Sequence, residues 1–184
     1  MRLLVLLAVC LPAAAGELLL NGGFELPLDS GWTIDSGGHA RATFSRDTGL
    51  QPDPDYEART HLGPADGYAS LTQTVPVPGP RLTFKADLCL YAHFTEPTNW
   101  AAAGCRITYL DSARAPLGET RIYVATARCP WQSSSTLHLI PAADSFWHSY
   151  ELDIAAELLD NLPGVDTSLV RFISVGLKDT SGAS

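Results

Sequence analysis

The sequence is poor in basic residues. Lysine and arginine number 12 against 20 aspartates and glutamates, and the formal net charge at pH 7 is −8. No basic cluster interrupts this acidic background, so we expect no nucleic-acid partner. Long apolar runs are also scarce: beyond residue 16, no stretch approaches the roughly 20 apolar residues that a membrane-spanning helix needs. We therefore expect neither a nucleic-acid-binding protein nor a membrane span.

Motifs typical of enzymes are missing as well. The chain has no Gly-x-Ser-x-Gly elbow, no His-Glu-x-x-His zinc helix and no glycine-rich phosphate loop. Asp53 and Asp55 form a carboxylate pair, but they lie in a proline-rich stretch without the apolar surroundings of a general acid. The histidines are scattered singly, at His39, His61, His93, His138 and His148. We predict that the protein is not an enzyme; a hydrolase whose two carboxylates meet only in space is the alternative.

The first 16 residues have the pattern of a secretory signal peptide. Arg2 provides a positive start, residues 3–11 are almost all apolar, and residues 13–15 are small. We expect cleavage after residue 15 or 16 and a mature chain that is secreted, either extracellular or periplasmic. The alternative is a lipoprotein that is lipidated at Cys10.

Beyond this leader the cysteines are odd in number: Cys89, Cys105 and Cys129. An oxidising compartment favours disulfides. We predict one disulfide between Cys105 and Cys129, because these two flank an expected hairpin, with one thiol left over. The alternative is that the cysteines are simply small buried residues.

Short strands dominate the rest of the chain. Its 13 prolines and 15 glycines occur at short intervals, as is typical of strands joined by turns. Residues 81–94 alternate strictly between apolar and polar side chains, which predicts a half-buried strand. Further strands are predicted at residues 105–110, 117–126, 147–154 and 170–177, with weaker signals at 18–20, 31–34, 40–45, 68–75 and 136–139.

One helix is predicted, over residues 154–162. Asp153 can cap its start, and the Pro-Gly pair at residues 163–164 ends it. Because this helix is short and lies between two strands, we expect it at the rim of the molecule. The whole pattern predicts a single all-β domain over residues 17–184, folded as a two-sheet sandwich.

Several segments carry a family likeness. Residues 20–25 read Leu-Asn-Gly-Gly-Phe-Glu and are followed shortly by Gly31 and Trp32. This opening resembles that of carbohydrate-binding jelly-roll modules of the galactose-binding-like type. Residues 66–75 and 146–153 resemble an early strand region and a late strand of the same family. The likeness implies a jelly-roll β-sandwich whose ligand is carbohydrate.

The end of the sequence departs from that family. Its members usually close with a further strand that contains a Val-Asp-Asp-Ile-like stretch, whereas this sequence stops at residues 178–184. We therefore expect a C-terminally truncated chain that lacks this last strand. Such a chain would leave a sheet edge or a gap that favours pairing with a partner.

The resemblance also implies a structural calcium site. In such modules the glutamate of the opening motif, backbone carbonyls and a last-strand carboxylate hold the ion, and Glu25 is the matching residue here. We predict Asp47, in the loop of residues 46–49, as a second oxygen donor, because calcium takes six to eight oxygens. The alternative is that Glu25 is a surface residue at a strand end.

Candidate ligand-binding residues combine aromatic rings with polar neighbours, an arrangement that suits an amphipathic ligand. They are Lys85, Asp87, Tyr91 and His93 on the solvent face of residues 81–94, and Trp100 and Trp131 in loops. Trp131 could instead cover a disulfide. We predict a secreted, non-catalytic carbohydrate-binding module; the alternatives are a structural or adhesive surface protein that binds protein partners, and a hydrolase.

Overall fold

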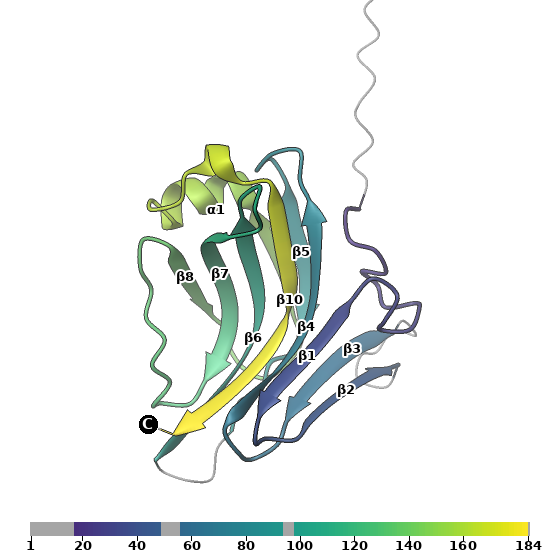
Figure 1. Ribbon diagram of the computed structural model, residues 1–184. Helices are drawn as coiled ribbons and strands as arrows, with labels where there is room; N and C mark the ends of the chain where they lie inside the picture. The colour runs from purple at the N-terminus through teal and green to yellow at the C-terminus, as the bar shows by residue number, and fades with distance from the viewer. Residues whose placement is uncertain (1–16, 49–55, 94–97, 184) are drawn as a thin grey trace, which may run out of the picture.

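The computed structural model describes residues 17–48, 56–93 and 98–183 (Figure 1). Within these ranges the chain forms strands, one α-helix, α1 (Ile154–Asn161), and one short 3-10 helix, η1 (Thr167–Leu169). The strands are β1 (Thr33–Gly38), β2 (Ala42–Asp47), β3 (Glu57–Leu62), β4 (Gly67–Pro76), β5 (Thr83–Leu88), β6 (Asn99–Leu110), β7 (Pro116–Ala125), β8 (Leu137–Pro141), β9 (His148–Asp153) and β10 (Phe172–Ala183). The predicted signal peptide with Cys10, and the Asp53–Asp55 pair, lie outside the described residues.

Six strands form the larger sheet, in the order β1-β4-β10-β6-β7-β8. Its neighbouring strands are antiparallel except β7 and β8, which run parallel. β10 lies between β4 and β6 and pairs with both of them over most of its length. The sheet is therefore built from strands that are far apart in the sequence, as Figure 1 shows.

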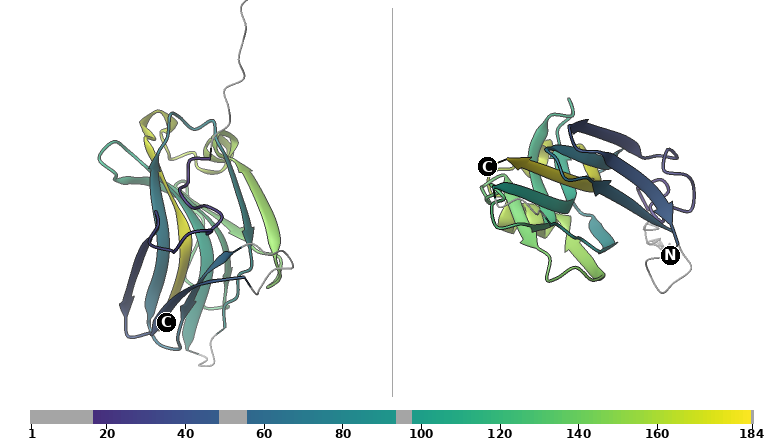
Figure 2. Two further views of the ribbon diagram at one scale, coloured as in Figure 1. Left: turned by 90° about the vertical axis from the view of Figure 1, so that its right-hand side faces the viewer. Right: turned by 90° about the horizontal axis from the view of Figure 1, so that it is seen from below.

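The pairs β2–β3 and β5–β9 form the second layer, which covers the inner face of the larger sheet (Figure 2). Phe84 of β5 and Leu152 of β9 pack against the core cluster that contains Ile107 and Val175. On the other side of this layer, β3 lies against β4 and β10. The predicted all-β sandwich with one short helix is confirmed.

Period-two alternation decides which side chains enter the core. In β6, Cys105, Ile107 and Tyr109 are buried, while Arg106 and Thr108 between them point to the outer face. The strand predicted over residues 81–94 is too long, because β5 ends at Leu88 and its pairing with β9 ends there too. The burial of side chains and the pairing of backbones thus end at different residues.

The helix α1 closes one end of the sandwich, at the top of Figure 1. The Asp153 carboxylate caps it by accepting hydrogen bonds from the backbone N–H groups of Ala155 and Ala156, at 2.9 and 3.1 Å, as the sequence predicted. Ile154 and Leu158 on its inner side are 2% and 1% exposed. No helix in the described ranges is long and apolar enough to span a membrane.

Glu157 also points inward from α1. Its Oε1 accepts hydrogen bonds from Thr120 Oγ1 at 2.7 Å and from His138 Nδ1 at 2.6 Å, and its Oε2 accepts one from Asn161 Nδ2 at 2.8 Å. The Tyr109 hydroxyl lies 3.1 Å from the same threonine oxygen. This buried polar group ties the helix to β6, β7 and β8.

The predicted disulfide between Cys105 and Cys129 is wrong, because the cysteines in the described ranges are free thiols. Cys105 lies in the core opposite Ile122 of β7, and burial raises the pKa of its thiol to about 12. Cys129 lies past the end of β7, which stops at Ala125. The two residues therefore do not flank a paired position of the hairpin.

Candidate functional site

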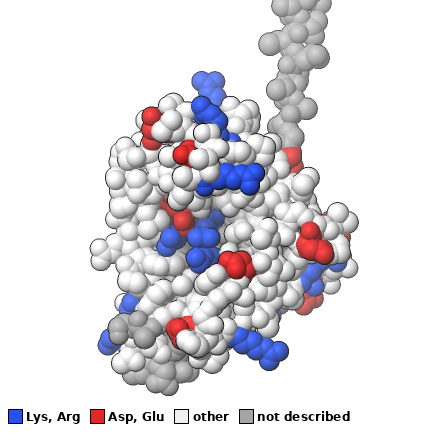
Figure 3. All heavy atoms as spheres, viewed as in Figure 1, with Lys and Arg blue, Asp and Glu red and all other residues white. Residues whose placement is uncertain are grey.

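The outer face of the larger sheet carries a group of polar and aromatic side chains, most of them half-buried, which we call the sheet face. Their positions follow from alternation, because the residues between core positions on each strand point to the other side. Basic and acidic atoms gather in the middle of this face (Figure 3). The sheet face consists of Asp35, Tyr68, Trp100, Arg106, Glu119, Arg121, Tyr123, Trp131 and Lys178.

Glu119 lies between two arginines in the centre of the sheet face. Its carboxylate pairs with the guanidinium of Arg121, and its Oε2 lies 3.9 Å from Arg106 Nη1. These side chains are only 16–22% exposed. Arg106 lies opposite Arg121 in the β6–β7 register, and its buried Nε has no hydrogen-bond partner among the described residues. Because this nitrogen is closed off from solvent, the exposed part of the Arg106 side chain lies elsewhere on it.

Lys178 adds a third positive charge on the neighbouring strand β10. Its ammonium nitrogen lies 5.2 Å from the centre of the Tyr68 ring. The Tyr68 hydroxyl donates a hydrogen bond to Asp35 Oδ2 at 3.0 Å. Burial lowers the pKa of Lys178, and the nearby positive charge of Arg106 lowers it further. The centre of the face thus holds cations close together at a cost in electrostatic energy.

An aromatic cluster adjoins these charges. The ring of Trp131 lies 6.4 Å from that of Trp100 and 5.8 Å from that of Tyr123, between ring centres. The guanidinium carbon of Arg121 lies 4.4 Å from the centre of the Trp131 ring, within the range of a cation–π contact. Trp100 packs closely on Gly182 of β10, where an added Cβ would lie 3.0 Å from its Nε1. Both tryptophan rings are therefore held in place by neighbours.

Two glycines lie on the strands beside the charged groups. Gly176 is opposite Arg106, and Gly104 is opposite Lys178, in the β6–β10 register. Both glycines occupy outward positions, since their neighbours in each strand are core residues. Both glycines are nevertheless buried, and an added Cβ would clash with the backbone oxygen of Ile122 at Gly104 and of Leu71 at Gly176. A ligand with flat apolar ring faces and polar edge groups suits the aromatic cluster and the charged groups beside it.

Comparison with known proteins gives structural likeness alone. No protein-family model and no curated protein sequence matches the chain. The family 11 carbohydrate-binding module of the cellulosomal cellulase Lic26A-Cel5E of Clostridium thermocellum is 18% identical, over 93% of this chain and 94% of that one, with a TM-score of 0.43. A family 11 module of Clostridium thermocellum, in complex with a β-1,3-1,4-mixed-linked tetrasaccharide, is 15% identical over 89% and 91%, with a TM-score of 0.42.

A third structure is the enzymatically active domain of tailspike protein 4 of bacteriophage CBA120, with 14% identity, 92% of this chain covered and a TM-score of 0.45. The chain spans only 20% of that protein. Carbohydrate-binding jelly rolls, the group that the sequence resembles, are thus among the structural neighbours. Identities of 14–18% and TM-scores of 0.42–0.45 are too low to establish a family or a ligand.

The predicted ligand-binding residues fall into two groups. Trp100 and Trp131 come together on the sheet face, although Trp100 belongs to β6 rather than to a loop. The other four are Lys85 and Asp87, which lie on β5 of the second layer, and Tyr91 and His93, which follow the end of that strand. Tyr91 is 67% exposed, and its ring centre lies 6.4 Å from that of His93. One site cannot use both groups, because they lie on opposite layers of the sandwich.

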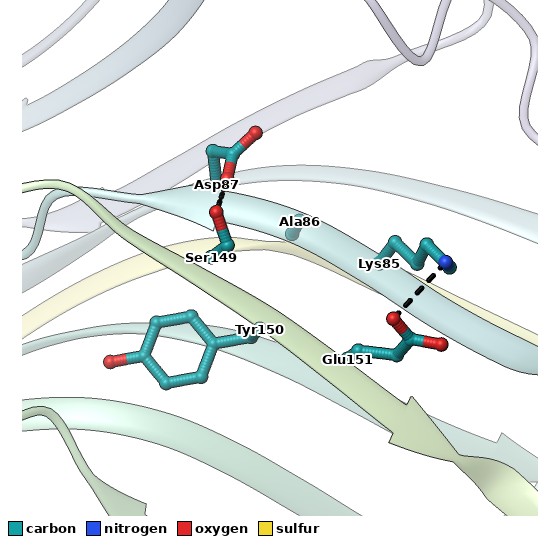
Figure 4. A pocket seen from close by; sticks show the side chains of 6 residues that line it. All are labelled: Lys85, Ala86, Asp87, Ser149, Tyr150 and Glu151. Atoms are coloured by element: carbon teal, nitrogen blue, oxygen red, sulfur yellow. Dashed lines mark hydrogen bonds and ion pairs between the residues drawn. The ribbon is translucent and has the colours of Figure 1, made fainter.

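A shallow hollow of ≈ 450 Å³ marks the second group, on the β5–β9 pair (Figure 4). Its polar groups satisfy one another: Lys85 Nζ lies 3.1 Å from Glu151 Oε2, and Ser149 donates a hydrogen bond to Asp87. Figure 4 shows the ring of Tyr150 turned away from the ion pair. The cation of this hollow is therefore paired, whereas Lys178 of the sheet face forms no ion pair within 4 Å among the described residues.

A larger hollow of ≈ 590 Å³ opens between β3 and β5, which do not pair with each other. Ala58 and Phe84 contribute to its sides, and Cys105 and Val175 to its floor. The second layer is therefore not continuous, and mostly apolar side chains line the gap. Glu25 also lines this hollow.

The predicted calcium ligands lie in a region that already contains a cation. The guanidinium of Arg46 donates hydrogen bonds to the backbone carbonyls of Phe24 and Glu25. Asp47 Oδ1 accepts a hydrogen bond from the backbone N–H of Thr48 at 2.8 Å. In the described ranges, no three His, Cys, Asp or Glu side chains are grouped to hold a metal. A calcium ion at these carbonyls would have to displace Arg46, so the residues present fit the ion poorly.

The charged half of the sheet face was not among the residues predicted from the sequence. Arg106 and Arg121 alternate with buried neighbours in β6 and β7, so their outward position was readable from the pattern. Lys178 could not be placed beside them, because nothing local indicates that β10 inserts next to β6. The local alternation thus predicts on which face of the sheet a side chain lies, whereas the strand order decides which side chains lie beside it.

Proposed function

We propose that the protein binds carbohydrate on the sheet face and does so without catalysis. The observation that carries this proposal is the Trp100–Trp131–Tyr123 cluster beside the charged side chains of Arg106, Arg121 and Lys178. Sugar rings present apolar C–H faces and polar hydroxyl edges. Aromatic rings beside hydrogen-bonding groups match both features.

The openness of the site favours an extended glycan. The sheet face spans several adjacent strands whose spacing is about 4.8 Å. A polysaccharide or oligosaccharide can lie across such a surface and contact the aromatic cluster and the charged centre together. The structural likeness to carbohydrate-binding modules accords with this proposal but does not decide it.

The proposal is tested by replacing Trp131 with alanine. A half-buried tryptophan that contacts a ligand contributes about 1–2 kcal/mol, which corresponds to a loss of about 5- to 30-fold in affinity. Affinity electrophoresis against a panel of soluble polysaccharides, followed by calorimetry on the best binder, measures this loss. Tyr91→Ala is the matched control, because Tyr91 is an exposed aromatic residue of the other layer.

The two variants separate the two candidate surfaces. We expect Trp131→Ala to weaken binding and Tyr91→Ala to leave it unchanged, with the circular dichroism of both as in the parent protein. Loss of binding in Tyr91→Ala alone would transfer the site to the second layer. Retention of no polysaccharide of the panel at high protein concentration would refute the proposed function.

We propose further that residues 1–16 are removed during export, which the mass of the secreted protein's N-terminal peptide would establish. Calcium binding through Glu25, which the resemblance implies, with Asp47 as a second oxygen donor, remains a prediction. It requires the melting temperature to rise in calcium relative to chelator, and Arg46→Ala to bind the ion more readily. Screening with chromogenic glycosides tests the non-catalytic part, since turnover in the parent protein would contradict it.

A further inference from the structure

The positive centre of the sheet face contrasts with the rest of the molecule. The protein has a net charge of −8, yet Arg106, Arg121 and Lys178 converge on adjacent strands. An acidic protein repels anions at long range. A local group of cations that the fold brings together can therefore bind an anion that the rest of the surface repels.

The carboxylates nearby do not use up this charge. Glu119 is in direct contact with Arg121 and lies 3.9 Å from Arg106. Asp35 accepts the hydrogen bond of Tyr68. Lys178 forms no ion pair within 4 Å among the described residues. Arg106 and Arg121 thus share one carboxylate, and Lys178 is the cation that lacks a paired carboxylate.

Arg106 has the chemistry to hold an oxyanion. A guanidinium offers five N–H donors in a planar fork that matches the oxygens of a carboxylate or sulfate. The buried Nε of Arg106 has no partner among the described residues, although a buried donor without a partner costs stability. That nitrogen is closed off from solvent, but the Arg106 side chain is 22% exposed elsewhere. An anionic group at this exposed part would relieve the repulsion from Lys178 and Arg121.

The aromatic cluster lies one strand away. Arg106 is opposite Arg121, and Arg121 stacks on Trp131. A sugar ring on Trp131 can therefore direct a substituent across Arg121 toward the exposed part of Arg106. We infer that the ligand of the sheet face is an acidic saccharide, whose carboxylate or sulfate group binds Arg106 with support from Lys178. This inference rests on the proposed function and names its ligand class.

The test compares matched acidic and neutral probes by calorimetry. Oligogalacturonides carry uronate carboxylates, and their methyl esters have the same rings without the charge. Sulfated galactan oligosaccharides and their desulfated forms supply the second pair. We expect at least a tenfold preference for the acidic member of one pair, and that pair identifies the group as carboxylate or sulfate. We also expect the preference to fall as salt is raised.

Charge-removing variants locate the anion. Arg106→Gln should abolish the preference, and Lys178→Gln should reduce it, while Arg59→Gln on β3 in the other layer removes the same charge and should leave it unchanged. Unfolding curves of each variant show whether the domain remains folded; if Arg106→Gln unfolds, Lys178→Gln carries the test.

The failures are distinguishable. If neutral glycans bind as well as acidic ones, or if Arg59→Gln weakens acidic binding as much as Arg106→Gln, the inference is overturned and carbohydrate binding stands. If no glycan of either kind binds, both the inference and the proposed function fail.

Discussion

Replacing Glu157 with glutamine perturbs a buried carboxylate with little change in volume. The Glu157 side chain is 5% exposed and accepts hydrogen bonds from Thr120, His138 and Asn161. In the glutamine variant, one oxygen can still accept from Thr120 and His138. The new amide, however, faces the amide of Asn161, so that this third contact must rearrange or be lost.

The magnitude follows from the kind of bond that changes. A hydrogen bond to a charged group contributes about 1.5–3 kcal/mol, against about 1 kcal/mol between neutral groups. Weakening the two retained bonds to Glu157 therefore costs about 1–3 kcal/mol, and losing the third about 1 kcal/mol more. We expect Glu157→Gln to lower the free energy of unfolding by about 2–4 kcal/mol.

Urea unfolding followed by tryptophan fluorescence measures this difference. Glu151→Gln is the control, because Glu151 is 65% exposed and pairs with Lys85 at the surface. Exposed ion pairs contribute about 0–1 kcal/mol, so this variant should unfold near the parent midpoint. Equal midpoints for Glu157→Gln and the parent protein would refute the reasoning, since the buried network would then contribute nothing.

Three further predictions concern the thiols, the core and pH. Burial raises the pKa of the Cys105 thiol to about 12, so Cys105 should resist alkylation at pH 8 in the folded protein, while the exposed Cys89 reacts. Peptide mapping that finds both cysteines labelled together would contradict this. Leu158→Ala should cost about 2–5 kcal/mol of unfolding free energy, whereas Leu159→Ala, at a 74% exposed position, should change it little. Burial raises the pKa of Asp179. Its contribution to the free energy of unfolding is therefore present below the ordinary aspartate pKa and is lost as pH rises through the raised value. Asp179→Asn should gain stability relative to the parent protein between pH 3 and pH 7, and a difference in unfolding free energy that does not change with pH would count against this.

Local pattern was sufficient for much of the fold. The alternation of residues 105–110 and 117–126 predicted the β6–β7 hairpin, and Asp153 predicted the start of α1. These features depend on neighbouring residues, whose chemistry is legible in sequence. The overextended strand after Leu88 is the instructive exception, because alternation reports burial and not backbone pairing.

The site required information that no local pattern holds. Trp100 and Trp131 were singled out by residue type, yet their contact depends on the loop after β7 returning over the sheet. Tyr91 and His93 have the same residue chemistry but lie on the other layer. Residue type alone was therefore enough to select candidate residues. The order of the strands was needed to tell which of these candidates share a surface.

The central place of β10 also governs how the domain can fold. Its partners β4 and β6 both precede it in the chain, so during synthesis they leave the ribosome with their facing edges uncovered. Contacts of such long sequence separation form slowly, and open edges in the meantime invite pairing between chains. Until β10 inserts, Lys178 is not beside Arg106, and the larger sheet exists only as two halves. Binding activity should therefore return during refolding no faster than this one strand is captured.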